Sequence, residues 1–100
     1  MNDKSLNLLG LARRANLISI GFDSVKSAIK SQKSTLILFA ADLSVRTKEQ
    51  VENLAKPQKI ATITTSYTAE DFFAALGKRG AIISVNDEGF TTSIKKILNT

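Results

Sequence analysis

The sequence predicts an α/β domain, a three-layer α/β/α sandwich in which helices cover both faces of a central sheet. Its 100 residues suffice for a single domain with one hydrophobic core. The run Leu36–Ala41 is apolar without polar alternation, as in a strand buried on both faces. Segments of strand and helical character alternate along the chain, which is typical of parallel strands joined by helices. We therefore expect residues 36–41 to form an inner strand of a parallel sheet.

The first helix is expected to begin at Ser5, a good N-cap residue that precedes a broad apolar face. Arg13 and Arg14 fall in its last turn, where positive charge suits the carbonyl end of the helix dipole. An RNA contact is the other interpretation of this arginine pair, and the sequence does not separate the two. Asn16 can end the helix in a left-handed conformation, and residues 17–20 are predicted as a short strand.

A second helix is expected directly after Gly21. Three lysines at i, i+4 and i+7 would line one face of it: Lys26, Lys30 and Lys33. A basic stripe that leads away from a helix N-terminus can follow a phosphate backbone. The alternative is a solvated lysine face without a ligand.

The alternation continues after the central strand. Ser44 is expected to open a third helix, with Thr47 and Gln50 as a second capping pair that the sequence also allows. Pro57 is expected to end the helix. Residues 59–64 alternate like a strand with one less buried face.

The last third of the chain begins with a capping signal. Thr68 and Asp71 have the spacing of a capping box, followed by a short helix that Gly77 would terminate. Residues 77–80 form a mobile basic loop before a strand at residues 81–85. A final amphipathic helix completes the predicted pattern.

Composition excludes several chemistries and favours a nucleic-acid partner. The chain has no cysteine and no histidine, which rules out disulfides, a Cys–His zinc site and a Ser-His-Asp triad. A net charge of +5 and a pI near 9.8 are typical of small domains that bind nucleic acid. The amino-terminal segment lacks the order of a secretory signal, and no run spans a membrane, so we expect a cytoplasmic protein without membrane contact.

Several short motifs, in their order and spacing, resemble a known protein family. They are Leu9–Ala15 (LGLARRA), Gly21 at a helix start, Leu36–Asp42 (LILFAAD) and Leu76–Lys78 (LGK). Over essentially its whole length the chain is similar to the L7Ae/L30e ribosomal-protein family, in its small bacterial YlxQ-like branch. The resemblance implies a four-stranded mixed sheet, one domain over residues 1–100 and a non-catalytic RNA-binding function.

The resemblance also implies where RNA would bind. Members that bind kink-turns, sharply bent internal loops of structured RNA, use the start of the second helix and the loops after the second strand and before the last. By position these are residues 21–30, 42–44 and 77–81. Phosphate contacts are expected from the basic residues, and specificity from residues 21–24. The candidate RNA-binding residues are Gly21, Phe22, Asp23, Ser24, Lys26, Ser27, Lys30, Lys33, Asp42, Leu43, Ser44, Gly77, Lys78, Arg79, Gly80 and Ala81.

The second-helix motif departs from the family pattern. Kink-turn binders carry Gly-x-Asn-Glu-x-x-Lys, whereas this chain has Asp23, Ser24 and Ser27 at the asparagine, glutamate and lysine positions. Phe22 either stacks on an unpaired base or packs as a core aromatic. The expected partner is therefore structured RNA, with ribosomal RNA, the ribosome or another ribonucleoprotein as candidates, and the motif does not name the RNA.

Two alternatives use the same residues. A protein-interaction or regulatory module of this fold, with little RNA affinity, would account for the altered motif. An enzyme would use Asp42 at the end of a strand, but the sequence supplies no matching acidic metal pocket, and a helix-capping role suits Asp42 better. We expect a monomer that needs no cofactor and no metal.

Overall fold

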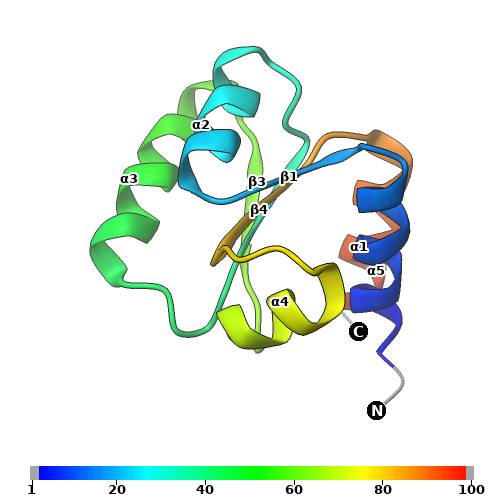
Figure 1. The fold of residues 1–100 in the computed structure, drawn as a ribbon. Helices are drawn as coiled ribbons and strands as arrows, with labels where there is room; N and C mark the ends of the chain where they lie inside the picture. The colour runs from blue at the N-terminus through cyan, green and yellow to red at the C-terminus, as the bar shows by residue number, and fades with distance from the viewer. Residues whose placement is uncertain (1–2, 99–100) are drawn as a thin grey trace.

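The structure, a computed structural model, describes residues 3–98 (Figure 1). The elements in chain order are α1 (Lys4–Arg14), β1 (Ile18–Ile20), α2 (Phe22–Lys30), β2 (Leu36–Phe39), α3 (Val45–Ala55), the 3-10 helix η1 (Lys56–Gln58), β3 (Ala61–Thr64), α4 (Ala69–Leu76), β4 (Ile82–Val85) and α5 (Glu88–Leu98). All the predicted helices and strands are present. The 3-10 turn that contains Pro57 was not predicted, and it shortens the expected strand at residues 59–64 to β3.

The four strands form one mixed sheet in the order β1-β4-β2-β3. β2 and β3 are parallel, whereas β4 is antiparallel to both of its neighbours, β1 and β2. The inner position of β2 is therefore confirmed, and so is the mixed sheet that the family resemblance implied. The wholly parallel sheet predicted from the alternation of strands and helices is wrong.

The reversal of β4 follows from where α4 lies. β3 ends at Thr64 beside Phe39, and β4 begins at Ile82 beside the same residue. The chain thus leaves and re-enters the sheet at one end, because α4 lies at that end and does not lead back to the start of β3. α2 and α3 do return, so β1, β2 and β3 share one direction.

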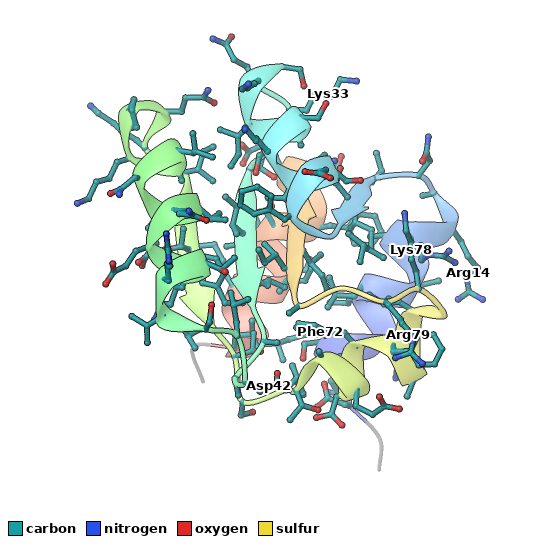
Figure 2. The ribbon with its side chains drawn as sticks, turned by 60° about the vertical axis from the view of Figure 1, so that its left-hand side comes forward. Arg14, Lys33, Asp42, Phe72, Lys78 and Arg79 are labelled. Atoms are coloured by element: carbon teal, nitrogen blue, oxygen red, sulfur yellow. The ribbon has the colours of Figure 1, made fainter. Side chains whose placement is uncertain are left out.

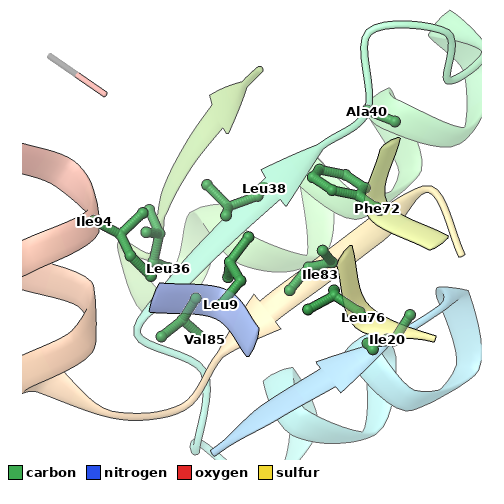
Figure 3. Close-up of a cluster of buried hydrophobic side chains, with 10 residues drawn as sticks. All are labelled: Leu9, Ile20, Leu36, Leu38, Ala40, Phe72, Leu76, Ile83, Val85 and Ile94. Carbon is green, nitrogen blue, oxygen red and sulfur yellow. The ribbon is translucent and has the colours of Figure 1, made fainter. Parts of the chain in front are cut away.

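Both faces of the sheet are covered, and β2 contributes to both cores. Its side chains alternate, with Leu36 and Leu38 packed in the cluster with α1, α4 and α5. Ile37 and Phe39 pack on the opposite face, in the cluster with α2 and α3. Figure 3 shows the first cluster, in which Leu9, Phe72 and Ile94 from three helices meet the sheet. Each large apolar side chain buried in this way stabilises the fold by roughly 1.5–3 kcal/mol.

The helix ends agree with the sequence signals, with one exception. Thr68 and Asp71 form the predicted capping box at α4, and Gly77 ends that helix in the left-handed conformation at φ 74°. Asn16 also adopts a positive φ, of 62°. Ser5, however, does not cap α1, because the Asp3 carboxylate, a charged acceptor at the position before the helix, accepts the Ser5 and Leu6 N–H groups instead.

Asp3 also joins the start of α1 to the loop before α4. The Tyr67 hydroxyl donates to Asp3 Oδ2 at 2.6 Å, and the buried Ser5 hydroxyl donates to Asp3 Oδ1 at 2.7 Å. The Tyr67 hydrogen bond lowers the pKa of Asp3 and outweighs the opposing effect of burial. Burial and the Asp3 carboxylate both raise the pKa of Tyr67. These bonds connect residues that lie 64 positions apart in the chain.

Tyr67→Phe is expected to lower the free energy of unfolding by about 1 kcal/mol near neutral pH, because a hydrogen bond to a carboxylate is lost. The folded-state pKa of Asp3 is depressed, so its stabilising contribution is present above the unfolded-state pKa of about 3.9 and is lost as the pH falls through the folded-state value. The difference between wild type and Tyr67→Phe should therefore shrink below pH 3.8.

Urea unfolding of the two proteins at neutral and acid pH measures this difference. Asp3→Asn serves as the matched variant, since Tyr67→Phe should cost less stability in its background than in the wild type. A loss that stays constant from neutral pH into acid would show that the Tyr67 hydroxyl acts independently of Asp3.

Candidate nucleic-acid interface

The three predicted RNA-binding segments meet at one end of the sheet. β1 and β2 finish at this end and β4 starts there, so that Ile20 lies opposite Ile83 and Phe39 opposite Ile82. Backbone hydrogen bonds connect the segments: the Gly21 N–H donates to the Ile82 carbonyl at 2.9 Å, and the Ala40 N–H donates to the Ala81 carbonyl at 2.8 Å. We call this region, formed by residues 21–24, 40–44 and 77–81, the Gly21 end of the sheet.

Two glycines, Gly21 and Gly80, occupy the point where the loop before β4 meets the start of α2. Gly21 has φ 94°, a conformation that other residues rarely adopt, and a Cβ at this position would meet no atom within 4 Å. Gly80 is required for a different reason, because its Cβ would lie 2.6 Å from Ile20 Cγ2 and 3.0 Å from the Gly21 nitrogen. The loop before β4 therefore packs directly against the start of α2.

The first turn of α2 is open to solvent at the Gly21 end. Gly21 is the N-cap, and no side chain of the described residues caps the helix. Asp23, Ser24 and Ser27 are all exposed. Backbone N–H groups at such a helix start can bind phosphate, and the neighbouring side chains can reach exposed bases.

Phe22 is packed rather than free. It is half-buried against the cluster between the sheet and the helices α2 and α3. The Lys26 ammonium lies 6.0 Å from the centroid of its ring. The structure therefore favours packing over base stacking for Phe22, and the ring in turn positions Lys26 close to the helix start.

The predicted lysine stripe does not continue along α2. The helix ends at Lys30, and Gln32 reverses the chain with φ 62°. The Gln32 and Lys33 N–H groups donate to the Ile29 and Ala28 carbonyls, the pattern of a Schellman helix end. Lys33 therefore does not lie on the helix face with Lys26, and Figure 2 shows it at the far end of α2 from Asp42 and Arg79. Lys30, in the last turn, is also remote from the Gly21 end.

The loop after α4 carries the other cations at the Gly21 end. It begins at Gly77, and both Lys78 and Arg79 are exposed. The Arg79 guanidinium lies 4.5 Å from the ring centroid of Phe73, a cation–π contact that limits its motion. Because the residue is nevertheless exposed, Arg79 is a cation that the Phe73 ring positions and that solvent reaches.

The loop after β2 has structural roles in two helices. Asp42 Oδ1 accepts the Ala69 N–H at 2.9 Å, which caps α4 rather than the helix that follows Asp42 in the chain. Ser44 is the N-cap of α3, as predicted, and Leu43 packs against the cluster with α2 and α3. Asp42 therefore acts as a helix cap. Within residues 3–98 no group of three Asp or Glu residues is placed to hold a metal ion.

One exposed apolar residue next to the Gly21 end was missed by the sequence interpretation. Val45, the first residue of α3, is 69% exposed, which is unusual for a large apolar side chain. Its position relative to the buried Val51 and Ala55 puts it outside the inward face of a 3.6-residue helix. The helical periodicity of residues 45–55 could therefore have identified Val45 as an exposed apolar side chain beside the 42–44 loop.

No helix in the described part of the chain has the length and apolarity needed to cross a membrane.

Two solved structures share this fold. A protein of unknown function from Bacillus halodurans superimposes with a TM-score of 0.91 and 26% identity, covering 99% of this chain and 100% of that one. A 15.5 kD RNA-binding protein of Giardia lamblia has a TM-score of 0.77 and 13% identity, covering 99% of this chain and 88% of that one. At 13% identity, the similarity to the Giardia lamblia protein shows a shared fold alone.

Two curated proteins are similar to the chain over nearly its whole length, both described as RNA-binding protein YlxQ. The protein of Enterococcus faecium is 26% identical over 95 residues, or 95% of this chain and 91% of that protein. The protein of Bacillus subtilis is 28% identical over 97 residues and 92% of each chain. The profile of the ribosomal protein L7Ae/L30e/S12e/Gadd45 family matches residues 3–90. With this match and the shared sheet, the chain belongs to the L7Ae/L30e/S12e/Gadd45 family.

Proposed function

We propose that this protein binds structured RNA at the Gly21 end of the sheet. One observation carries the proposal: the uncapped start of α2 and the exposed loop with Lys78 and Arg79 lie in direct contact through Gly21 and Gly80. A helix N-terminus and neighbouring cations together suit the phosphates of a folded RNA. The described function of the YlxQ relatives supports the same class of partner.

The charges at this end divide into attracting and opposing groups. Lys26, Lys78 and Arg79 would attract phosphates, and the +5 net charge of the chain adds a favourable long-range field. Asp23 and Asp42 are exposed carboxylates at the same end. The hydrogen bond from the Ala69 N–H holds Asp42 at the start of α4, whereas Asp23 lies in the first turn of α2, where it would face the RNA directly.

Selectivity for kink-turns is proposed to be weak. Asp23 presents a carboxylate where the kink-turn binders present an amide, and a carboxylate cannot donate a hydrogen bond. Ser24 and Ser27 are short, and both are exposed rather than held toward a common point. The RNA would then be recognised mainly by its shape and phosphates, as is usual for structured RNA.

The wider role follows from the same surface. We propose a non-catalytic, monomeric, cytoplasmic protein whose RNA partner is ribosomal RNA or belongs to another ribonucleoprotein. The helix-capping roles of Asp42 and Ser44 and the packing of Leu43 suit the loop after β2 to supporting the interface rather than to catalysis.

Replacing Lys78 and Arg79 by glutamine should weaken binding to structured RNA and reduce its salt dependence. Each lost phosphate contact lowers the slope of log affinity against log salt by roughly 0.7–0.9, so a total of about 1.5 is expected for two contacts. Lys30→Gln with Lys33→Gln removes the same charge at the far end of α2 and should change the slope by less than about half of that amount.

Titrations of a kink-turn RNA at several salt concentrations measure both variants against wild type. If the Lys30 and Lys33 pair produces the larger change, the RNA lies along the far end of α2 and the proposed site is misplaced. If the affinity of wild type for RNA does not depend on salt, the protein does not recognise RNA through its phosphates.

Asp23→Asn, Ser24→Glu and Ser27→Lys together should raise selectivity for a kink-turn over a straight duplex at least tenfold, since each base-edge contact is worth about 1–3 kcal/mol by analogy with DNA readout. The three side chains are exposed, so stability should change little. The triple variant adds one positive charge, and Ser93→Lys, on the exposed side of α5, adds the same charge elsewhere.

Both variants are titrated against the two RNAs at fixed salt. An equal gain in Ser93→Lys would assign the effect to net charge. Tight, selective kink-turn binding by wild type would show that residues other than these three recognise the bend.

A further inference from the structure

A groove of about 310 Å³ lies between the ends of α1 and α4, outside the segments of the Gly21 end. Arg13 and Arg14 border it from α1, and Leu76 borders it from α4. The chain continues from Leu76 through Gly77 into the loop with Lys78 and Arg79. The groove therefore adjoins the proposed RNA interface, and in Figure 2 Arg14 and Lys78 project from the same side of the molecule.

Charge is separated along the junction of α1 and α4. The groove at the ends of the two helices is lined by two arginines and no carboxylate, and both arginines are exposed. A second hollow, at the beginnings of the same helices, is lined by Asp3 and Asp71. An anionic strand that reaches the loop after α4 is thus attracted toward Arg13 and Arg14 and repelled from the opposite end of the junction.

Gly10 keeps the groove open. Glycine weakens a helix interior relative to alanine, so the glycine in α1 calls for a structural or functional explanation. Helix packing does not supply one, because a Cβ at Gly10 would lie 3.9 Å from the Ala75 carbonyl oxygen, an ordinary contact. Without a side chain at this position, the groove offers the apolar surface of Leu6 and Ala75 together with Asn7 and the two arginines. A nucleotide can use this combination, with its base against the apolar or guanidinium surface and its phosphate on a cation.

We propose that the groove beside Gly10 holds an unpaired nucleotide of the bound RNA, with adjoining phosphates on Arg13 and Arg14. The single-stranded segment continues from the phosphates bound at Lys78 and Arg79. The inference rests on the proposed function, because it extends that interface along α1. Stabilisation of the helix dipole alone is the competing explanation of the two arginines, and it makes a different prediction.

The test compares a structured hairpin RNA with and without a single-stranded tail of about six nucleotides. Wild type should bind the tailed hairpin more tightly, by about fivefold or more, because the tail adds phosphate contacts at Arg13 and Arg14 and places a base against the groove. Arg13→Gln with Arg14→Gln should abolish this gain and lower the salt slope for the tailed RNA by about 1.4, or roughly 0.7 per phosphate on a single strand.

Lys95→Gln with Lys96→Gln is the matched control, because these lysines occupy the last turn of α5, a helix of the same 11-residue length. The control pair should retain the gain from the tail. Gly10→Ala is a second variant that tests the groove separately: it should raise the melting temperature slightly, because alanine favours the helix interior, and keep the salt slope while losing most of the gain.

The outcomes separate this inference from the proposed function. If wild type binds the bare hairpin in a salt-dependent way but the tail adds nothing, the groove is not an RNA site and the interface at the Gly21 end stands. An equal loss of the gain in the arginine and lysine pairs would also overturn the inference. Wild type that binds neither RNA would overturn both proposals.

Discussion

The candidate interface depends on the reversal of one inner strand. β4 runs against β1 and β2, so its first residue lies beside the last residues of both. A parallel β4 would begin at the opposite end of the sheet, and the basic loop that precedes it would be separated from Gly21 by the length of the strands. The direction of β4 thus decides whether the cations of residues 77–81 and the start of α2 belong to one surface or to two.

The reversal is held in place by short contacts that involve mostly backbone. Gly21 donates to the Ile82 carbonyl, Ala40 donates to the Ala81 carbonyl, and Gly80 approaches Gly21 more closely than any residue with a Cβ could. Asp42 adds a side-chain bond to the first turn of α4. Since α4 determines where the chain re-enters the sheet, this bond supports the same arrangement from the other side of the loop.

The sequence predicted those features that arise between near neighbours in the chain. The apolar run at Leu36, the capping box at Thr68 and the helix end at Gly77 are local, and each is confirmed. The misassigned features have two origins. The cap of α1 was misplaced within a local signal, because Asp3, two residues before Ser5, accepts the N–H groups at the helix start. The role of Asp42 as a cap of α4, by contrast, depends on Ala69, 27 positions away.

The direction of β4 was missed for a related reason, because an alternation of strands and helices does not reveal that α4 stays at one end of the sheet. The position of Lys33 illustrates a smaller limit of prediction from residue spacing. An i+7 spacing places a residue on a helix face only while the helix lasts, and Gln32 ends it in a left-handed turn. Within the candidate site, the sequence motifs indicated the three segments and the helical periodicity contained the signal for Val45, whereas the choice between packing and stacking for Phe22 required the structure.

The uncapped start of α2 has a consequence for how such a protein can change. Because Gly21 holds the first turn through its backbone, the side chains at Asp23, Ser24 and Ser27 contribute no bond on which the helix depends. Exposed positions of this kind usually tolerate substitution within about 0.5 kcal/mol of stability. The scaffold and the proposed recognition surface are therefore under nearly independent constraints, and under that proposal a lineage could exchange one RNA for another at these positions without first acquiring a more stable fold.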